Sequence, residues 1–269
     1  MKTFVITGTT SGIGRALLEK FSKDNLVYAG FRNPEYEAEL AEIENVTPFY
    51  IDMEKPETIV SAAEFIKSKT ERVDVLINAA GCVIAGAMEH MDADRLRKQF
   101  QVNTFSHLEF TQKLLPVLAG GRVINISSMS SFGIFPFVAP YCASKRALDI
   151  LFNAMELEMG GRIKVVSIKP GVIATPLWEK SIGLNREALE GDEKYSVEMK
   201  YMEKNAQKNG KKGLPVEKVV KVITKAVEAK TPKCSYTVGF DAKCAELVSK
   251  LPFDVVNKII TVGMKKKFG

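Results

Sequence analysis

The chain has 269 residues, of which 46% are hydrophobic and 26% charged, and this is the composition of a globular protein with a deep core. Such a composition excludes extensive disorder, and the absence of any apolar run of about 18 residues argues against a membrane-spanning helix. The net charge of +6 is concentrated in residues 194–269, which hold 17 basic and 7 acidic side chains, but aromatic residues are not interleaved with these lysines, so we expect no nucleic-acid partner.

Short apolar runs alternate with helical patterns along most of the chain. We expect strands at 2–7, 26–31, 46–51, 73–77, 121–127, 162–169 and 235–238, and helices at 12–23, 56–69, 92–118, 141–159, 215–230 and from 253 onward. This alternation is typical of a parallel sheet covered on both faces. The sequence therefore predicts an α/β fold: one doubly wound, Rossmann-type domain over residues 1–269, with a parallel seven-stranded sheet and helices on both faces. Ligands of such folds bind outside the carboxyl edge of the sheet.

Residues 176–213 interrupt this alternation. They are polar, charged and weakly periodic, and no strand is expected among them. We interpret them as an insertion over the ligand edge, which would act as a substrate lid rather than as a second domain.

The first predicted strand runs into a glycine-rich loop that opens a helix. Its sequence is Thr7-Gly8-Thr9-Thr10-Ser11-Gly12-Ile13-Gly14. Glycines allow the backbone to approach a pyrophosphate, and the N-terminus of the following helix offers free N–H groups. The spacing lacks the Gly-Lys-Ser/Thr ending of an ATP-binding loop, so we predict dinucleotide binding at this loop, with a simple tight turn as the alternative.

The second predicted strand ends without a carboxylate. NAD-binding folds usually carry an acidic residue there, which binds the ribose hydroxyl. Here the strand ends Ala29-Gly30-Phe31-Arg32-Asn33. A guanidinium group can instead bind a 2′-phosphate, so Arg32 favours NADP(H) over NAD(H), unless this arginine is only a solvated loop residue.

A tyrosine and a lysine lie four residues apart on the helix predicted at 141–159. Tyr141 and Lys145 share one helix face, where a cation would stabilise the phenolate and lower the pKa of the tyrosine. Ser128 follows the strand at 121–127, and we expect it to reach the same edge of the sheet as Tyr141. The alternative role for Ser128 is that of a capping hydroxyl.

Together these motifs resemble the short-chain dehydrogenase/reductase family. The resemblance covers residues 2–175 and extends to about 240. Beyond the glycine loop and Tyr141-x-x-x-Lys145, it rests on Asp52, Asn78-Ala79-Ala80-Gly81, Asn103, Ser128 and Pro170-Gly171-x-Ile173-x-Thr175. One departure is Ala79, where the family often has a second asparagine.

The resemblance implies a role for each matching residue. Ser128 would hold the substrate oxygen, Tyr141 would exchange a proton with it, and Lys145 would bind the nicotinamide ribose and lower the pKa of Tyr141. Asn103 would hold a water that links Lys145 to solvent, or would only stabilise a helix kink. The cofactor would be bound by Gly8, Thr10, Ser11, Gly12, Ile13, Gly14, Arg32, Asp52, Met53, Asn78, Ala79, Ala80, Gly81, Tyr141, Lys145, Pro170, Gly171, Ile173 and Thr175.

The implied reaction is hydride transfer between NADP(H) and a small-molecule carbonyl or secondary alcohol. Apolar residues near the site favour an apolar substrate, and within the family the chain loosely resembles the branch that contains the hydroxysteroid and retinol dehydrogenases. Alternatives are a non-redox epimerase or dehydratase that retains nicotinamide, and an NADP(H)-binding redox sensor without turnover. The family also suggests a homodimer or homotetramer.

The cysteines and the basic tail complete these expectations. Four scattered cysteines without a Cys-x-x-Cys pair, and only two histidines, predict reduced thiols in a cytoplasmic protein and no metal site. The tail from Phe253 is basic and amphipathic. We expect it to be a packed final helix, with contact to an anionic membrane surface as the alternative.

Overall fold

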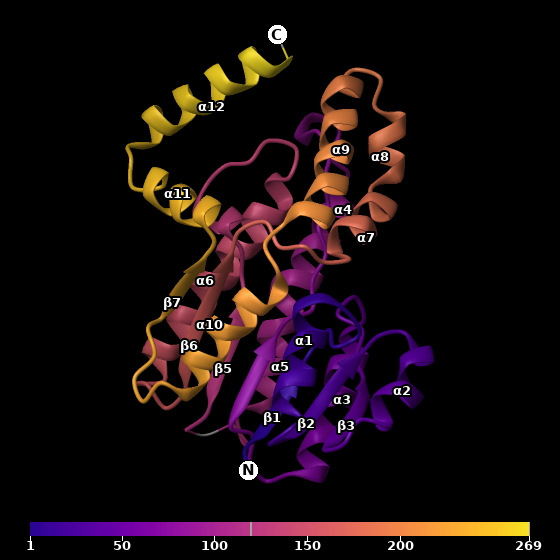
Figure 1. The fold of residues 1–269 in the computed structure, drawn as a ribbon, viewed down its shortest axis with the longest axis vertical. Helices are drawn as coiled ribbons and strands as arrows, with labels where there is room; N and C mark the ends of the chain where they lie inside the picture. The colour runs from indigo at the N-terminus through magenta and orange to yellow at the C-terminus, as the bar shows by residue number, and fades with distance from the viewer. Residues whose placement is uncertain (119, 269) are drawn as a thin grey trace.

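A seven-stranded parallel sheet forms the centre of the computed structural model, which describes residues 1–118 and 120–268 (Figure 1). The strand order is β3-β2-β1-β4-β5-β6-β7. The strands are β1 (Thr3–Ile6), β2 (Leu26–Phe31), β3 (Val46–Tyr50), β4 (Val75–Asn78), β5 (Arg122–Ile126), β6 (Lys164–Pro170) and β7 (Ser235–Val238). The predicted fold class and all seven predicted strands are confirmed, while residue 269, the last of the predicted domain, lies outside the described residues.

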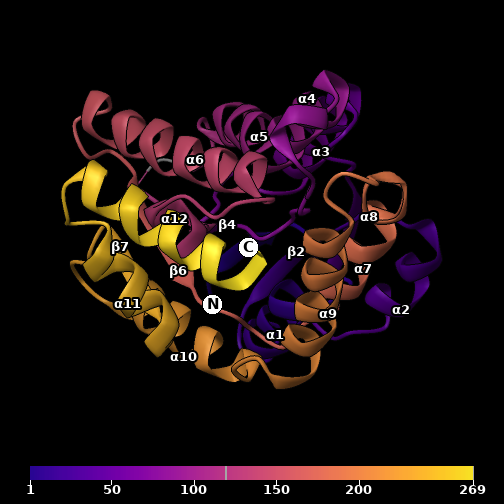
Figure 2. The same cartoon turned by 90° about the horizontal axis from the view of Figure 1, so that it is seen from above.

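Helices cover both faces of the sheet because successive strand residues point to opposite sides. In β1, Phe4 and Ile6 join one core and Val5 joins the other. The first core also contains residues of α1 (Gly12–Phe21), α2 (Glu37–Ala41) and α10 (Val216–Glu228). The second contains residues of α3 (Pro56–Lys69), α5 (Ser106–Leu114) and α6 (Ala139–Glu158), and Figure 2 shows the sheet between these two helical layers.

The helix predicted at 92–118 is not continuous. It forms α4 (Ala93–Phe100), a π-helical turn over Gln101–Phe105, and α5. A π-turn inserts one residue into the helical hydrogen-bond pattern and is frequent at functional sites. It rotates the buried Asn103 relative to a regular helix.

Residues 176–213 are mostly helical, as α7 (Leu177–Leu184), α8 (Arg186–Gly191) and α9 (Ser196–Lys212). The chain ends with α11 (Phe240–Val248), which the sequence pattern did not predict, and α12 (Phe253–Phe268). Viewed from above the carboxyl edge, α12 crosses the top of the molecule between α6 and α9 (Figure 2). Within 1–118 and 120–268, no helix combines the length and the apolar character needed to cross a membrane.

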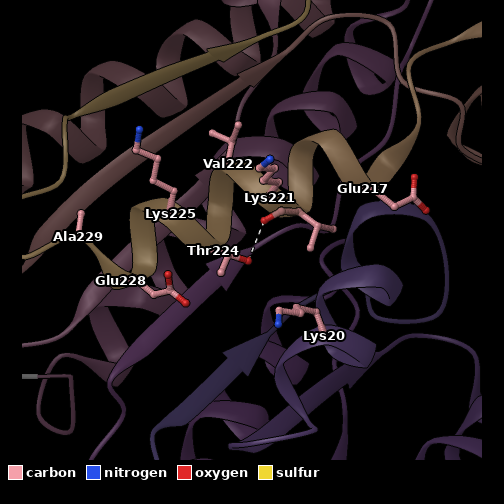
Figure 3. A pocket seen from close by; sticks show the side chains of 9 residues that line it. Lys20, Glu217, Lys221, Val222, Thr224, Lys225, Glu228 and Ala229 are labelled. Atoms are coloured by element: carbon pink, nitrogen blue, oxygen red, sulfur yellow. Dashed lines mark hydrogen bonds between the residues drawn. The ribbon is translucent and has the colours of Figure 1, made fainter.

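A shallow hollow of about 810 Å³ lies on the outside of α10 (Figure 3). Its lining comes from α10 and the residue that follows it, with Lys20 of α1 on the other side. None of the motif residues of the carboxyl edge lines it, so we assign it no part in the chemistry.

Candidate active site

The glycine loop forms a tight turn between β1 and α1. Gly8 and Gly12 have φ angles of +71° and +58°, a region that favours glycine. A Cβ on Gly14 would lie 2.2 Å from the carbonyl oxygen of Gly8, so only glycine lets α1 pack this closely on the loop. The helix N-terminus at Ser11 has no side-chain cap, and this leaves its N–H groups available to an anion.

The loop after β4 packs directly on the glycine loop. The hydroxyl oxygen of Thr7 accepts hydrogen bonds from the N–H groups of Ala79 (3.0 Å) and Ala80 (3.2 Å). The carbonyl of Ala80 forms a hydrogen bond with Nε2 of His107 at 2.9 Å. Because burial lowers the pKa of His107 to about 3, the imidazole is neutral and donates this bond from Nε2. Asn78 is buried and donates to Oδ1 of Asn125 at 2.8 Å. The 78–81 turn is thus fixed from three sides.

The loop after β6 closes the other side of the glycine loop. A Cβ on Gly12 would lie 3.3 Å from Cβ of Thr175. Ile173 pairs with Leu214 in an isolated parallel β-bridge, in which the Val172 carbonyl accepts from the N–H of Leu214 and the N–H of Ala174 donates to the Leu214 carbonyl. In this pairing the N–H of Ile173 points away from Leu214. Pro170 is the last residue of β6, and Gly171 packs so closely on Asp241 that a side chain would collide with its carboxylate.

Arg32 stands at the carboxyl end of β2 with 67% of its side chain exposed. Its only ion pair among the described residues is a long contact of 3.4 Å to Glu54. Asp52 accepts from the N–H of Glu54 at 3.0 Å, so it shapes the turn before α3, whereas Lys55 occupies the N-cap position. The side chain of Met53 is buried in the second core.

The structure brings Ser128, Tyr141 and Lys145 together at the carboxyl edge. Ser128 follows β5, and its hydroxyl also accepts from the N–H of Ser130 at 3.1 Å, so the capping role is real as well. Lys145 is buried, and its Nζ donates to the carbonyl of Ile126 at 2.8 Å. The same Nζ lies 5.9 Å from the ring centroid of Tyr141.

Burial shifts the pKa values of both Tyr141 and Lys145. Burial raises the pKa of Tyr141 to about 12, while its hydrogen bond with the Ser128 side chain acts in the opposite direction. Burial also lowers the pKa of Lys145 to about 8, against the nearby Asp149 carboxylate, which raises it. In the protein alone, desolvation is therefore the largest influence on the pKa of both side chains.

Asn103 is held by protein groups rather than left open. Its Oδ1 accepts from the N–H of Cys82 at 3.0 Å, and its Nδ2 donates to the Cys82 carbonyl (3.0 Å) and to the Ser144 hydroxyl (3.2 Å). A Cβ on Gly81 would lie 3.3 Å from Oδ1 of Asn103 and 3.6 Å from Nζ of Lys145. The Asn103 side chain therefore ties the helix irregularity to the loop after β4 and to α6, and its role in holding a water stays a prediction.

A buried ion pair between Asp149 and Lys169 lies near Lys145. Asp149 lies one turn after Lys145 on α6, and its Oδ2 is 3.0 Å from Nζ of Lys169 on β6. Both side chains are buried, and Nζ of Lys169 also lies 4.5 Å from the ring centroid of Phe132. Sequence reasoning missed this pair because its members lie on different elements and belong to no local motif.

Two further residues connect the 176–213 segment to the site. Lys180 of α7 donates to the hydroxyl of Ser11 in the glycine loop at 2.9 Å. Asn185 is buried, accepts from the N–H of Ala85 at 2.8 Å, and donates to the carbonyl of Val83 at 2.8 Å. The sequence offers no periodic signal for either residue, because both contacts cross long stretches of chain.

Comparisons with known proteins show which proteins this chain is similar to. The family model described as short chain dehydrogenase matches residues 2–183. The NADPH-dependent 3-dehydrocapnine reductase of Ornithobacterium rhinotracheale is 32% identical over 89% of this chain and 88% of its own. Among solved structures, a short chain dehydrogenase of Burkholderia cenocepacia in complex with NADP covers 100% of both chains with a TM-score of 0.71 at 23% identity. A short chain dehydrogenase/reductase of Burkholderia phymatum in complex with NAD covers 87% of this chain and 88% of its own, with a TM-score of 0.76 at 20% identity.

Gly14→Ala should displace the glycine loop. The added Cβ would lie 2.2 Å from the Gly8 carbonyl oxygen, and we expect a loss of about 1–3 kcal/mol in the free energy of unfolding, measured by denaturant titration. Gly183→Ala is the matched control, because nothing lies within 4 Å of its added Cβ, and it should leave stability unchanged or slightly raised. Equal effects of the two substitutions would show that the loop is not tightly packed.

Lys169→Met should remove the direct ion-pair partner of the buried Asp149 carboxylate and leave only the more distant charge of Lys145 near it. We expect the free energy of unfolding to fall by about 3–5 kcal/mol, and the double substitution Asp149→Asn/Lys169→Met to recover much of that loss. Arg186→Met removes the exposed partner of Glu190 and should cost under about 1 kcal/mol. A single variant that is as stable as the double variant would contradict the assignment of a buried ion pair.

Proposed function

The chain belongs to the short-chain dehydrogenase/reductase family and is therefore an oxidoreductase, and from this premise we propose that it interconverts a carbonyl compound and a secondary alcohol with NADP(H) as the cofactor. The observation that carries this proposal is the meeting of Ser128, Tyr141 and Lys145 at the carboxyl edge of the sheet. The pKa of Tyr141 responds to the Ser128 side chain, and this proximity supports a substrate oxygen held by both hydroxyls.

The residues at the carboxyl edge of the sheet have the chemistry that dinucleotide binding requires. The close packing of Gly14 on Gly8, the uncapped start of α1 and the turn at 78–81 form a backbone cradle beside the exposed Arg32. The adenine end would be bound by Arg32 and Asp52, the pyrophosphate by the loop from Gly8 to Gly14, and the nicotinamide end by residues 170–175. We further propose that 176–213 acts as the substrate lid of a single domain, since Lys180 and Asn185 connect it to this edge.

Three side chains perform the proton chemistry. When bound, NADP(H) supplies or accepts the hydride at its nicotinamide ring. Ser128 donates a hydrogen bond to the substrate oxygen and orients it, and Tyr141 donates its phenolic proton to that oxygen during reduction. Lys145 is fixed by its bond to the Ile126 carbonyl, so its ammonium group can bind ribose hydroxyls and stabilise the phenolate that Tyr141 becomes.

Cofactor preference depends on Arg32. Its guanidinium is exposed, and its contact with Glu54 is long enough to be exchanged for a phosphate. The similar reductase of Ornithobacterium rhinotracheale is named NADPH-dependent, which supports this preference, although a structural neighbour binds NAD.

The proposed substrate is apolar, because the loop before Tyr141 and the helix α7 both carry apolar side chains. Phe137, in the loop between Ser128 and Tyr141, packs against Tyr195 with ring centroids 5.8 Å apart. Ile134 in the same loop is exposed, and Trp178 of α7 is partly exposed. Side chains of this kind would bind the body of an apolar substrate while the hydroxyl groups orient its carbonyl.

Tyr141→Phe removes the proton donor while keeping the ring. We expect kcat for carbonyl reduction, followed by NADPH absorbance over a panel of ketones, to fall by about 100-fold to 10,000-fold, with NADPH affinity nearly unchanged. Tyr50→Phe, on the exposed side of β3, is the control and should retain full activity. Unchanged turnover in the Tyr141 variant would refute the proton role, and lack of turnover in the wild type with every ketone and alcohol would favour the sensor alternative.

Arg32→Ala should weaken NADPH binding by about 10-fold to 100-fold, because a charged hydrogen bond to the 2′-phosphate is lost, and should leave NADH binding unchanged. Arg97→Ala, at another exposed arginine, provides the control. Calorimetric titration measures the affinity of each variant for NADPH and for NADH. A wild type that binds NADH more tightly than NADPH would show that Arg32 does not select the cofactor.

A further inference from the structure

The outer face of α12 combines exposed apolar and cationic side chains. Val255, Ile259 and Val262 recur at intervals of four and three residues and are 41%, 51% and 65% exposed. Residues at this spacing share one side of a helix. We define the outer face of α12 as these three residues together with Lys258, Lys265 and Lys266, which are exposed as well.

The opposite side of α12 is attached to the body of the protein. Phe268 packs against Phe137 and Tyr201, with ring centroids 6.5 Å and 5.5 Å apart. Nζ of Lys267 lies 3.4 Å from the ring centroid of Tyr201. These contacts attach one side of the helix to α9 and to the loop before α6. The outer face of α12 therefore points away from the protein, toward solvent.

This face is strongly cationic for its size. Residues 253–268 contain four lysines and one acidic residue, Asp254, so their net charge is 4 − 1 = +3. The larger segment 194–269 has 17 basic and 7 acidic side chains, a surplus of 17 − 7 = +10, and this field would attract an anionic surface from a distance.

We propose that the outer face of α12 docks on an anionic lipid bilayer, with the helix lying in the plane of the interface. A helix with aliphatic side chains between lysines suits the boundary between acyl chains and charged headgroups. A second copy of this chain is a poorer occupant, because a two-fold contact would place equal positive charges against each other. Figure 1 shows α12 projecting at the end of the molecule farthest from the N-terminus, where a flat surface can reach it.

Such docking would place the bilayer on the side of the protein where the strands end. Figure 2 shows α12 in front of the carboxyl edge, between α6 and α9. The proposal does not depend on the reaction, because it concerns only the exposed residues of α12.

Sedimentation with vesicles tests the docking. The full chain should bind vesicles of phosphatidylcholine and phosphatidylglycerol, bind phosphatidylcholine alone far more weakly, and lose binding as salt is added. Lys258→Glu/Lys265→Glu/Lys266→Glu should weaken binding to the anionic vesicles by about 100-fold or more. Ile259→Ser/Val262→Ser should weaken it by about tenfold.

The matched control is Leu26→Ser/Leu157→Ser, which replaces two exposed apolar residues at the start of β2 and the end of α6, at the opposite edge of the sheet. It should bind the vesicles like the wild type, and circular dichroism and NADPH binding should show that every variant is folded. The proposal would be overturned if the wild-type protein did not bind the anionic vesicles, or if the α12 variants bound them as tightly as the wild type does. A mass from light scattering that falls only in the α12 variants would also overturn it and assign this face to a second copy of the chain.

Discussion

A buried ammonium group organises the carboxyl edge of this protein. Nζ of Lys145 donates to the carbonyl of Ile126, at the end of a central strand, and so ties α6 to the sheet. A charge in such a place requires compensation, to which the Asp149 carboxylate one turn away contributes by raising the pKa of Lys145. The position of Tyr141 follows from this arrangement, because the tyrosine lies one turn before Lys145 on the same helix.

The electrostatic balance at Tyr141 shows what the fold alone provides. Burial raises the pKa of the phenol to about 12, and burial lowers the pKa of Lys145 to about 8. The lysine therefore keeps its proton near neutrality, while the tyrosine is a weak acid until positive charge or hydrogen-bond donors act on its phenolate. In our account the protein provides the position of the phenol, and the acidity of Tyr141 is completed only when the dinucleotide is bound.

The sequence predicted those parts of the molecule that depend on local pattern. All seven strands and the helix at 56–69 could be predicted because apolar periodicity is strong there, and the glycine loop because Gly8, Gly12 and Gly14 have no sterically equivalent substitutes. The π-turn at Asn103 could not be predicted, because helical periodicity continues through it. The helices of 176–213, the Asn185 contacts and the Asp149–Lys169 pair were missed because long-range packing and charge pairing decide them. The same limit applied to the pKa of Tyr141, since spacing shows a neighbouring cation but not the extent of burial.

The account is tested most directly by titrating the Tyr141 phenol itself. The phenolate absorbance of the wild type, after subtraction of the Tyr141→Phe spectrum, would be followed against pH with and without NADP⁺, and again in Lys145→Met. We expect the pKa of Tyr141 to lie near 12 in the protein alone, to fall when NADP⁺ is bound, and to fall much less without the Lys145 amine. A pKa that is unchanged by NADP⁺, or that falls equally in the Lys145 variant, would contradict the central role of the buried lysine.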